Sequence, residues 1–128
     1  MNTSKALVAI AVFAFAFKFS ATAFPGPGHA PKYGGVVQEA GDMQYELVVK
    51  ADSIAIFVED HDKKVDTKGG TAKVTLLNGA NKIEATLVAA GGNKLEAKGS
   101  FKFAKGTKAV AVVQLAGKPI STARFVLP

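Results

Sequence analysis

Beyond residue 35, hydrophobic and polar positions alternate in short runs along the chain. In the segment 43–50, Met43, Tyr45, Leu47 and Val49 share one side, and mostly polar residues occupy the other. A period of two is typical of a β-strand with one buried face. We therefore predict a half-buried strand over 43–50, with these four side chains directed into the core.

Similar runs recur along the rest of the chain, separated by turn residues. Asn78-Gly79 is the clearest hairpin signal, because both residue types tolerate positive φ. Leu95, Ala97, Phe101 and Phe103 share one parity, which predicts a single strand with a bend at Gly99. The further predicted strands span 36–40, 53–59, 71–78, 82–89, 108–115 and 118–127.

After the first 23 residues, no window of the chain keeps a helical period of 3.6. About eight short strands with frequent turns favour a single antiparallel β-sandwich, immunoglobulin-like or similar. A small closed barrel is the alternative. We predict three regions: a signal peptide over 1–23, a Pro/Gly-rich leader over 24–34 and the sandwich domain over 35–128.

The amino-terminal segment has the pattern of an export signal. Lys5 precedes an unbroken apolar run over 6–17, and Ala21 and Ala23 form an A-x-A cleavage site. The run is shorter than the roughly 20 residues that span a bilayer, although an uncleaved anchor stays open as an alternative. We expect cleavage after Ala23, a periplasmic location and no membrane span in the mature chain.

Composition narrows the partners and the chemistry. Removal of the signal segment lowers the net charge from +6 to +4, and the remaining lysines are spread singly along the strands. This spacing is typical of a solvated sheet face rather than a nucleic-acid site, so we expect no nucleic-acid partner. The chain has no cysteine, so packing alone must stabilise it. No nucleophile motif, P-loop or dinucleotide fingerprint is present, and we expect no enzymatic activity.

Candidate metal ligands gather where the 53–59 strand ends. Asp60, His61 and Asp62 are consecutive, and His29 lies in the leader. Imidazole with carboxylates suits Cu(II) or Zn(II), so a copper or zinc ion is the candidate cofactor. Asp66, Met43 and Tyr33 are further helpers within the same chain.

Each of these residues also has a simpler interpretation. Asp60-His61-Asp62 fits an exposed turn at a strand end, and His29 fits a solvated histidine in the leader. Met43 fits a core position of its strand. The sequence pattern leaves both interpretations open.

The chain resembles a group of small exported proteobacterial proteins. The resemblance rests on G-G-V-V-Q-E-A-G-D-M-Q-Y-E-L-V, V-E-D-H-D-K-K-V-D-T-K-G, T-L-L-N-G-A-N-K and N-K-L-E-A-K-G-S-F, and it covers nearly all of the mature chain. These proteins are similar to a domain of periplasmic adaptor subunits of heavy-metal efflux systems of the resistance-nodulation-division type. In the group a histidine commonly precedes the Gly-Gly pair, whereas Tyr33 stands there in this chain.

The resemblance implies a periplasmic home and a link to metal resistance. Together with the residues, it favours a non-enzymatic periplasmic accessory that binds or buffers a transition-metal ion. Its partner would be a metal-efflux adaptor or another envelope protein. The alternative function is a structural or protein-interaction module of the cell envelope with no metal role.

Overall fold

The computed structural model describes residues 30–128, which form β-strands and no helix. The strands are β1 (Val36–Ala40), β2 (Met43–Lys50), β3 (Ser53–Asp60), β4 (Lys63–Lys64), β5 (Thr71–Asn78), β6 (Asn81–Ala89), β7 (Lys94–Lys98), β8 (Lys108–Gln114) and β9 (Ser121–Val126). The predicted signal peptide and its cleavage site lie outside the described residues. Within residues 30–128, no helix is long and apolar enough to cross a membrane.

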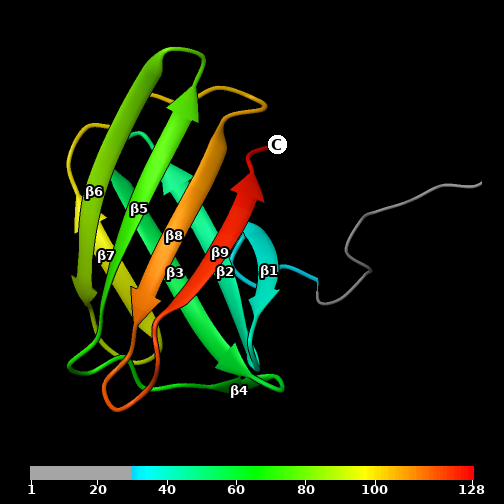
Figure 1. Cartoon of the computed structure of the whole chain (residues 1–128), viewed down its shortest axis with the longest axis vertical. Coiled ribbons are helices and arrows are strands. Elements are labelled where there is room, and N and C mark those ends of the chain that lie inside the picture. Colours follow the sequence, from blue (N-terminus) through cyan, green and yellow to red (C-terminus); the bar gives the residue numbers. More distant parts are fainter. Residues whose placement is uncertain (1–29) are drawn as a thin grey trace, which may run out of the picture.

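All the strands belong to one antiparallel sheet in the order β1-β2-β3-β7-β6-β5-β8-β9, with β4 paired to the end of β3. The sheet curls until its first and last strands, β1 and β9, come into contact, which makes a nearly closed barrel (Figure 1). The all-β prediction with antiparallel hairpins is confirmed. The single sheet does not show the two packed layers of a sandwich and is closer to the barrel alternative.

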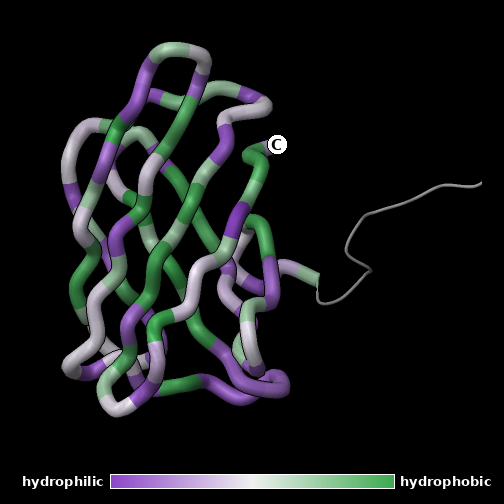
Figure 2. The backbone as a smooth tube through the Cα atoms, viewed as in Figure 1, coloured by the Kyte–Doolittle hydropathy of each residue, from purple (hydrophilic) through white to green (hydrophobic). Residues whose placement is uncertain are grey.

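The inward faces of the strands build one core along the barrel. Small residues stand opposite large ones there: Ala109 pairs with Leu76 on one side and with Phe125 on the other. In the next row of the same face, Ala111 lies between Val74 and Ala123. Because a narrow barrel has little interior space, small side chains on its inner face let the strands approach and the sheet curl. Figure 2 shows apolar residues along the strands that build this core.

The predicted strand over 95–103 is wrong beyond residue 98. The Gly99 N–H donates to the Asp52 carbonyl at 3.1 Å, and the Phe101 N–H donates to the Ala51 carbonyl at 2.8 Å. These bonds draw the chain across the β2–β3 turn, so 99–107 is an irregular loop. Phe101 still packs against the core, but the Phe103 side chain turns outward and is 41% exposed.

Candidate functional site

His61 and Asp62 are the two central residues of a tight turn. Asp60 at the end of β3 pairs with Lys63 at the start of β4, so only His61 and Asp62 lie between them. Their φ angles are 51° and 68°, as type I′ hairpin turns require at both central positions. Histidine and aspartate adopt this left-handed conformation more readily than most residues do. The prediction of a turn at the strand end is confirmed.

Contacts with Asp60 and Gln44 help to orient this turn. The His61 Nδ1 lies 2.5 Å from the Asp60 Oδ1, and the Asp62 N–H donates to the Gln44 Oε1 at 3.2 Å. The His61 side chain is 81% exposed. Because Asp60 engages one ring nitrogen, Nε2 is the ring atom that a ligand would approach.

The β1–β2 turn faces the same hairpin across an open hollow. The hollow has a volume of about 320 Å³ and is lined by Glu39, Gly41, Asp42, Gln44, His61 and Asp62. Figure 2 shows hydrophilic residues gathered along the β3–β4 hairpin. Lys63 and Lys64 follow directly in the chain and offset part of the negative charge. Carboxylates and lysine ammonium groups therefore lie close together at this end of the barrel.

The structure brings together only part of the predicted ligand set. His29 lies outside the described residues, and in 30–128 no group of three His, Asp or Glu side chains could hold a metal ion. Met43 is buried in the core, and the Asp66 carboxylate accepts the Lys68 N–H. Among the sequence candidates, His61 and Asp62 therefore share the hollow, with Asp60 behind the imidazole.

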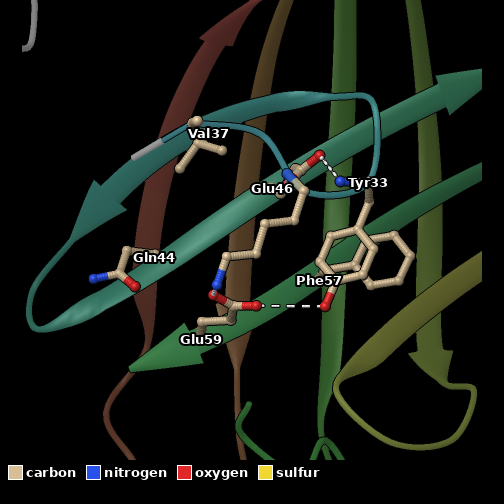
Figure 3. Close-up of a pocket in the computed structure, with 8 residues that line it drawn as sticks. Tyr33, Val37, Gln44, Glu46, Phe57 and Glu59 are labelled. Atoms are coloured by element: carbon tan, nitrogen blue, oxygen red, sulfur yellow. Dashed lines mark hydrogen bonds and ion pairs between the residues drawn. The ribbon is translucent and has the colours of Figure 1, made fainter. Parts of the chain in front are cut away.

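A second cluster of polar contacts holds the segment 30–35, here called the strap, against the outer face of β2 and β3 (Figure 3). The Glu46 carboxylate accepts backbone N–H groups from Lys32 at 2.7 Å, Tyr33 at 2.8 Å and Gly35 at 2.8 Å. Glu46 is only 4% exposed. A buried carboxylate needs such donors, because an unpaired charge away from water is costly.

The Tyr33 side chain completes this attachment. Its ring stacks on Phe57 with centroids 3.8 Å apart and planes 7° from parallel. Its hydroxyl group lies 3.4 Å from both the Glu59 carboxylate and the Asn93 side-chain nitrogen. Asn93 also donates to the Val58 carbonyl at 3.2 Å. Tyr33 is therefore a packing residue of the strap and is not directed at the His61 hollow.

Lys32 joins the strap to the β3–β4 hairpin. Its ammonium group donates to Glu59 Oε1 at 2.7 Å and lies 3.8 Å from Asp62 Oδ1. The hydrogen bond to Glu59 raises the pKa of Lys32 above its ordinary value of 10.5. Lys32 thus keeps its charge and places a positive group beside the carboxylates of the hairpin.

The strap site was not predicted from the sequence. Gln44 and Glu46 alternate with core residues of β2 and therefore fit a solvated face, yet they are 7% and 4% exposed. The hollow beneath the strap holds only about 20 Å³, enough for one water molecule. The sequence signal for the strap site was weak, since it consisted only of Glu46 and Glu59 in neighbouring predicted strands and a Tyr-Gly-Gly segment before them. The strap residues themselves therefore occupy this site on the outer face of β2 and β3.

No protein-family model matches this chain, and comparison with curated proteins and with solved structures found no significant match. The resemblance described from the sequence motifs therefore stays a prediction.

Proposed function

We propose that this chain is a non-enzymatic, exported accessory protein that captures a divalent transition-metal ion weakly at the His61 end of the barrel. The observation that carries the proposal is the hollow whose lining includes the His61 imidazole and the carboxylates of Asp42 and Asp62. The export pattern and the motif resemblance support a periplasmic role beside a heavy-metal efflux system.

The donor set defines the expected chemistry. One imidazole nitrogen with carboxylate oxygens and no thiolate favours Cu(II) over Zn(II) by the usual order of stability. The hollow is open, so the turns must close around the ion and water must fill the remaining positions. Both requirements predict weak to moderate affinity. Lys32 adds a repulsive charge 3.8 Å from Asp62 and lowers the affinity further.

Calorimetric titration of Cu(II) and Zn(II) into purified protein tests this function. We expect Cu(II) to bind the parent and His61→Ala to lose most of that binding. Binding should weaken at acidic pH, because only the neutral imidazole ring coordinates a metal ion. His29→Ala reports the contribution of the leader. Glu84→Gln is the matched control, since Glu84 is an exposed carboxylate on β6 outside the hollow.

Equal Cu(II) binding by parent and His61→Ala would refute the metal function. The interaction-module alternative would then take its place. One observation favours that alternative: Val126 on β9, the last strand of the sheet, is 59% exposed, as is Ile120 just before it. These two exposed apolar side chains are candidate contacts for a partner protein.

A further inference from the structure

The end of the barrel away from His61 holds a larger hollow. It has a volume of about 440 Å³ and lies between the β5–β6 hairpin and the 99–107 loop. Figure 1 shows this loop beside the hairpin at the end away from β4. Ligand pockets commonly measure about 300–1,000 Å³, so the hollow has the size of a small-molecule site.

One wall of this hollow is apolar. Leu76 and Ile83 line it from the hairpin, and Phe103 lines it from the loop. Among residues 30–128, Phe103 is the sole aromatic side chain among the exposed large hydrophobics. An exposed aromatic ring beside an open volume is a ready contact for an apolar ligand.

The loop that carries Phe103 is fixed on both sides. Before it, the Phe101 N–H donates to the Ala51 carbonyl at 2.8 Å. After it, the Ala104 N–H donates to the Thr107 hydroxyl at 3.0 Å, and the Thr107 N–H donates back to the Ala104 carbonyl at 3.0 Å. These anchors hold the Phe103 backbone at the wall of the hollow, so its exposed ring is a built feature of the loop.

The polar part of the lining is positively charged. Lys82 and Lys102 line the hollow together with the amides of Asn78 and Asn81. Lys82 lies 3.6 Å from Glu84. Lys102 forms no ion pair within the described part of the chain. A ligand with a negative group would give this ammonium a partner.

We propose that this hollow binds an amphiphilic anion, with an apolar body against Phe103 and Ile83 and a negative head group at Lys102 and Lys82. An acyl chain with a carboxylate and an acyl chain with a phosphate share this chemistry. A cationic amphiphile lacks the charge match, and a small hydrophilic anion lacks the apolar contact. This site is independent of the metal function, because it uses none of the same residues.

Fluorescence of 1-anilinonaphthalene-8-sulfonate, an aromatic anion, provides the direct probe on the purified protein. Decanoate and decyl phosphate, both below their micelle concentrations, should displace it. Decyltrimethylammonium and acetate should not. Displacement by both decyl anions means that the site recognises only the negative charge of the head group. Displacement by only one of them identifies the preferred head group. Either outcome supports the site.

Two variants and one matched control locate the binding. We expect Phe103→Ala to weaken probe affinity about tenfold. We expect Lys102→Gln to weaken decanoate binding several-fold, by an amount that shrinks at high salt. Lys105→Gln removes an exposed lysine of the same loop that does not line the hollow, and it should bind as the parent does.

Circular dichroism and urea midpoints establish that each variant is folded. If Phe103→Ala is unstable, Lys102→Gln alone decides, since Lys102 is an exposed side chain. Parent-like binding by Lys102→Gln, equal displacement by decyltrimethylammonium, or no displacement by either decyl anion would overturn the proposal.

Discussion

Replacing Glu46 by glutamine should release the strap. The carboxylate accepts three backbone N–H groups while only 4% exposed, and the amide offers one acceptor oxygen and turns an NH₂ group towards the same donors. Each hydrogen bond to a charged group contributes roughly 1.5–3 kcal/mol. The substitution cannot remove the summed free energy of all three hydrogen bonds, because the strap can detach while the barrel stays folded. The loss of stability is therefore limited to the net free energy with which the strap is attached.

We expect Glu46→Gln to lower the free energy of unfolding by about 2–4 kcal/mol. With an m-value of roughly 2 kcal/mol/M, the urea midpoint should fall by about 1–2 M. Hydrogen exchange supplies the local measurement: the Tyr33 and Gly35 amides should lose protection, while amides of β5 and β8 keep theirs when compared well below the new midpoint. Near-ultraviolet circular dichroism should also change as the Tyr33–Phe57 stack opens.

Glu84→Gln is the matched control for this experiment. The Glu84 side chain is 44% exposed, and its contacts to Lys73 and Lys82 are 3.8 and 3.6 Å long. An exposed pair of this kind contributes little, so the unfolding free energy should change by less than about 0.5 kcal/mol. The reasoning is wrong if Glu46→Gln keeps both the parent midpoint and the protection of the Tyr33 and Gly35 amides.

Two further predictions concern the same segment. Gly35→Ala should destabilise the protein by about 1–3 kcal/mol or displace the strap, because the new Cβ would lie 2.1 Å from the Leu47 carbonyl oxygen, and unchanged urea unfolding would contradict this. The raised pKa of Lys32 makes its pairing with Glu59 stabilising below pH 10.5, and this contribution is lost as the pH rises through the higher folded-state value. The stability difference between the parent and Lys32→Met should therefore stay constant from pH 8 to about 10.5 and narrow above it; a difference that narrows already at pH 8–9 would contradict the assignment.

The strands were predictable because the alternation of buried and exposed positions is visible within the sequence of each strand. Met43, Tyr45 and Leu47 alternate with polar residues, and Asn78-Gly79 marks a hairpin within a few residues of the strands it joins. The closure of the sheet depends instead on pairings between distant segments, such as β3 with β7 and β5 with β8. A period-two pattern identifies the inner face of a strand but not its neighbour, so a sandwich and a barrel share the same signal.

The candidate site was predictable to a similar extent. His61 and Asp62 were identified because they are adjacent in the sequence. Glu39 at the end of β1 and Asp42 in the β1–β2 turn could not be assigned to the site, because only the sheet register places this turn and the His61 turn at the same end. Glu46 was missed for a different reason. Because it alternates with core residues, its position predicts a solvent-exposed side chain, and the strap that covers it comes from a segment without hydrophobic periodicity.

The contact between β1 and β9 has a consequence for the order of folding. The strands β1 (Val36–Ala40) and β9 (Ser121–Val126) lie near opposite ends of the described chain, so bringing them together closes the longest loop in the barrel. Contacts of such sequence separation carry the largest loop-closure entropy and slow folding. The hairpins can form early, but the barrel cannot close until β9 is available.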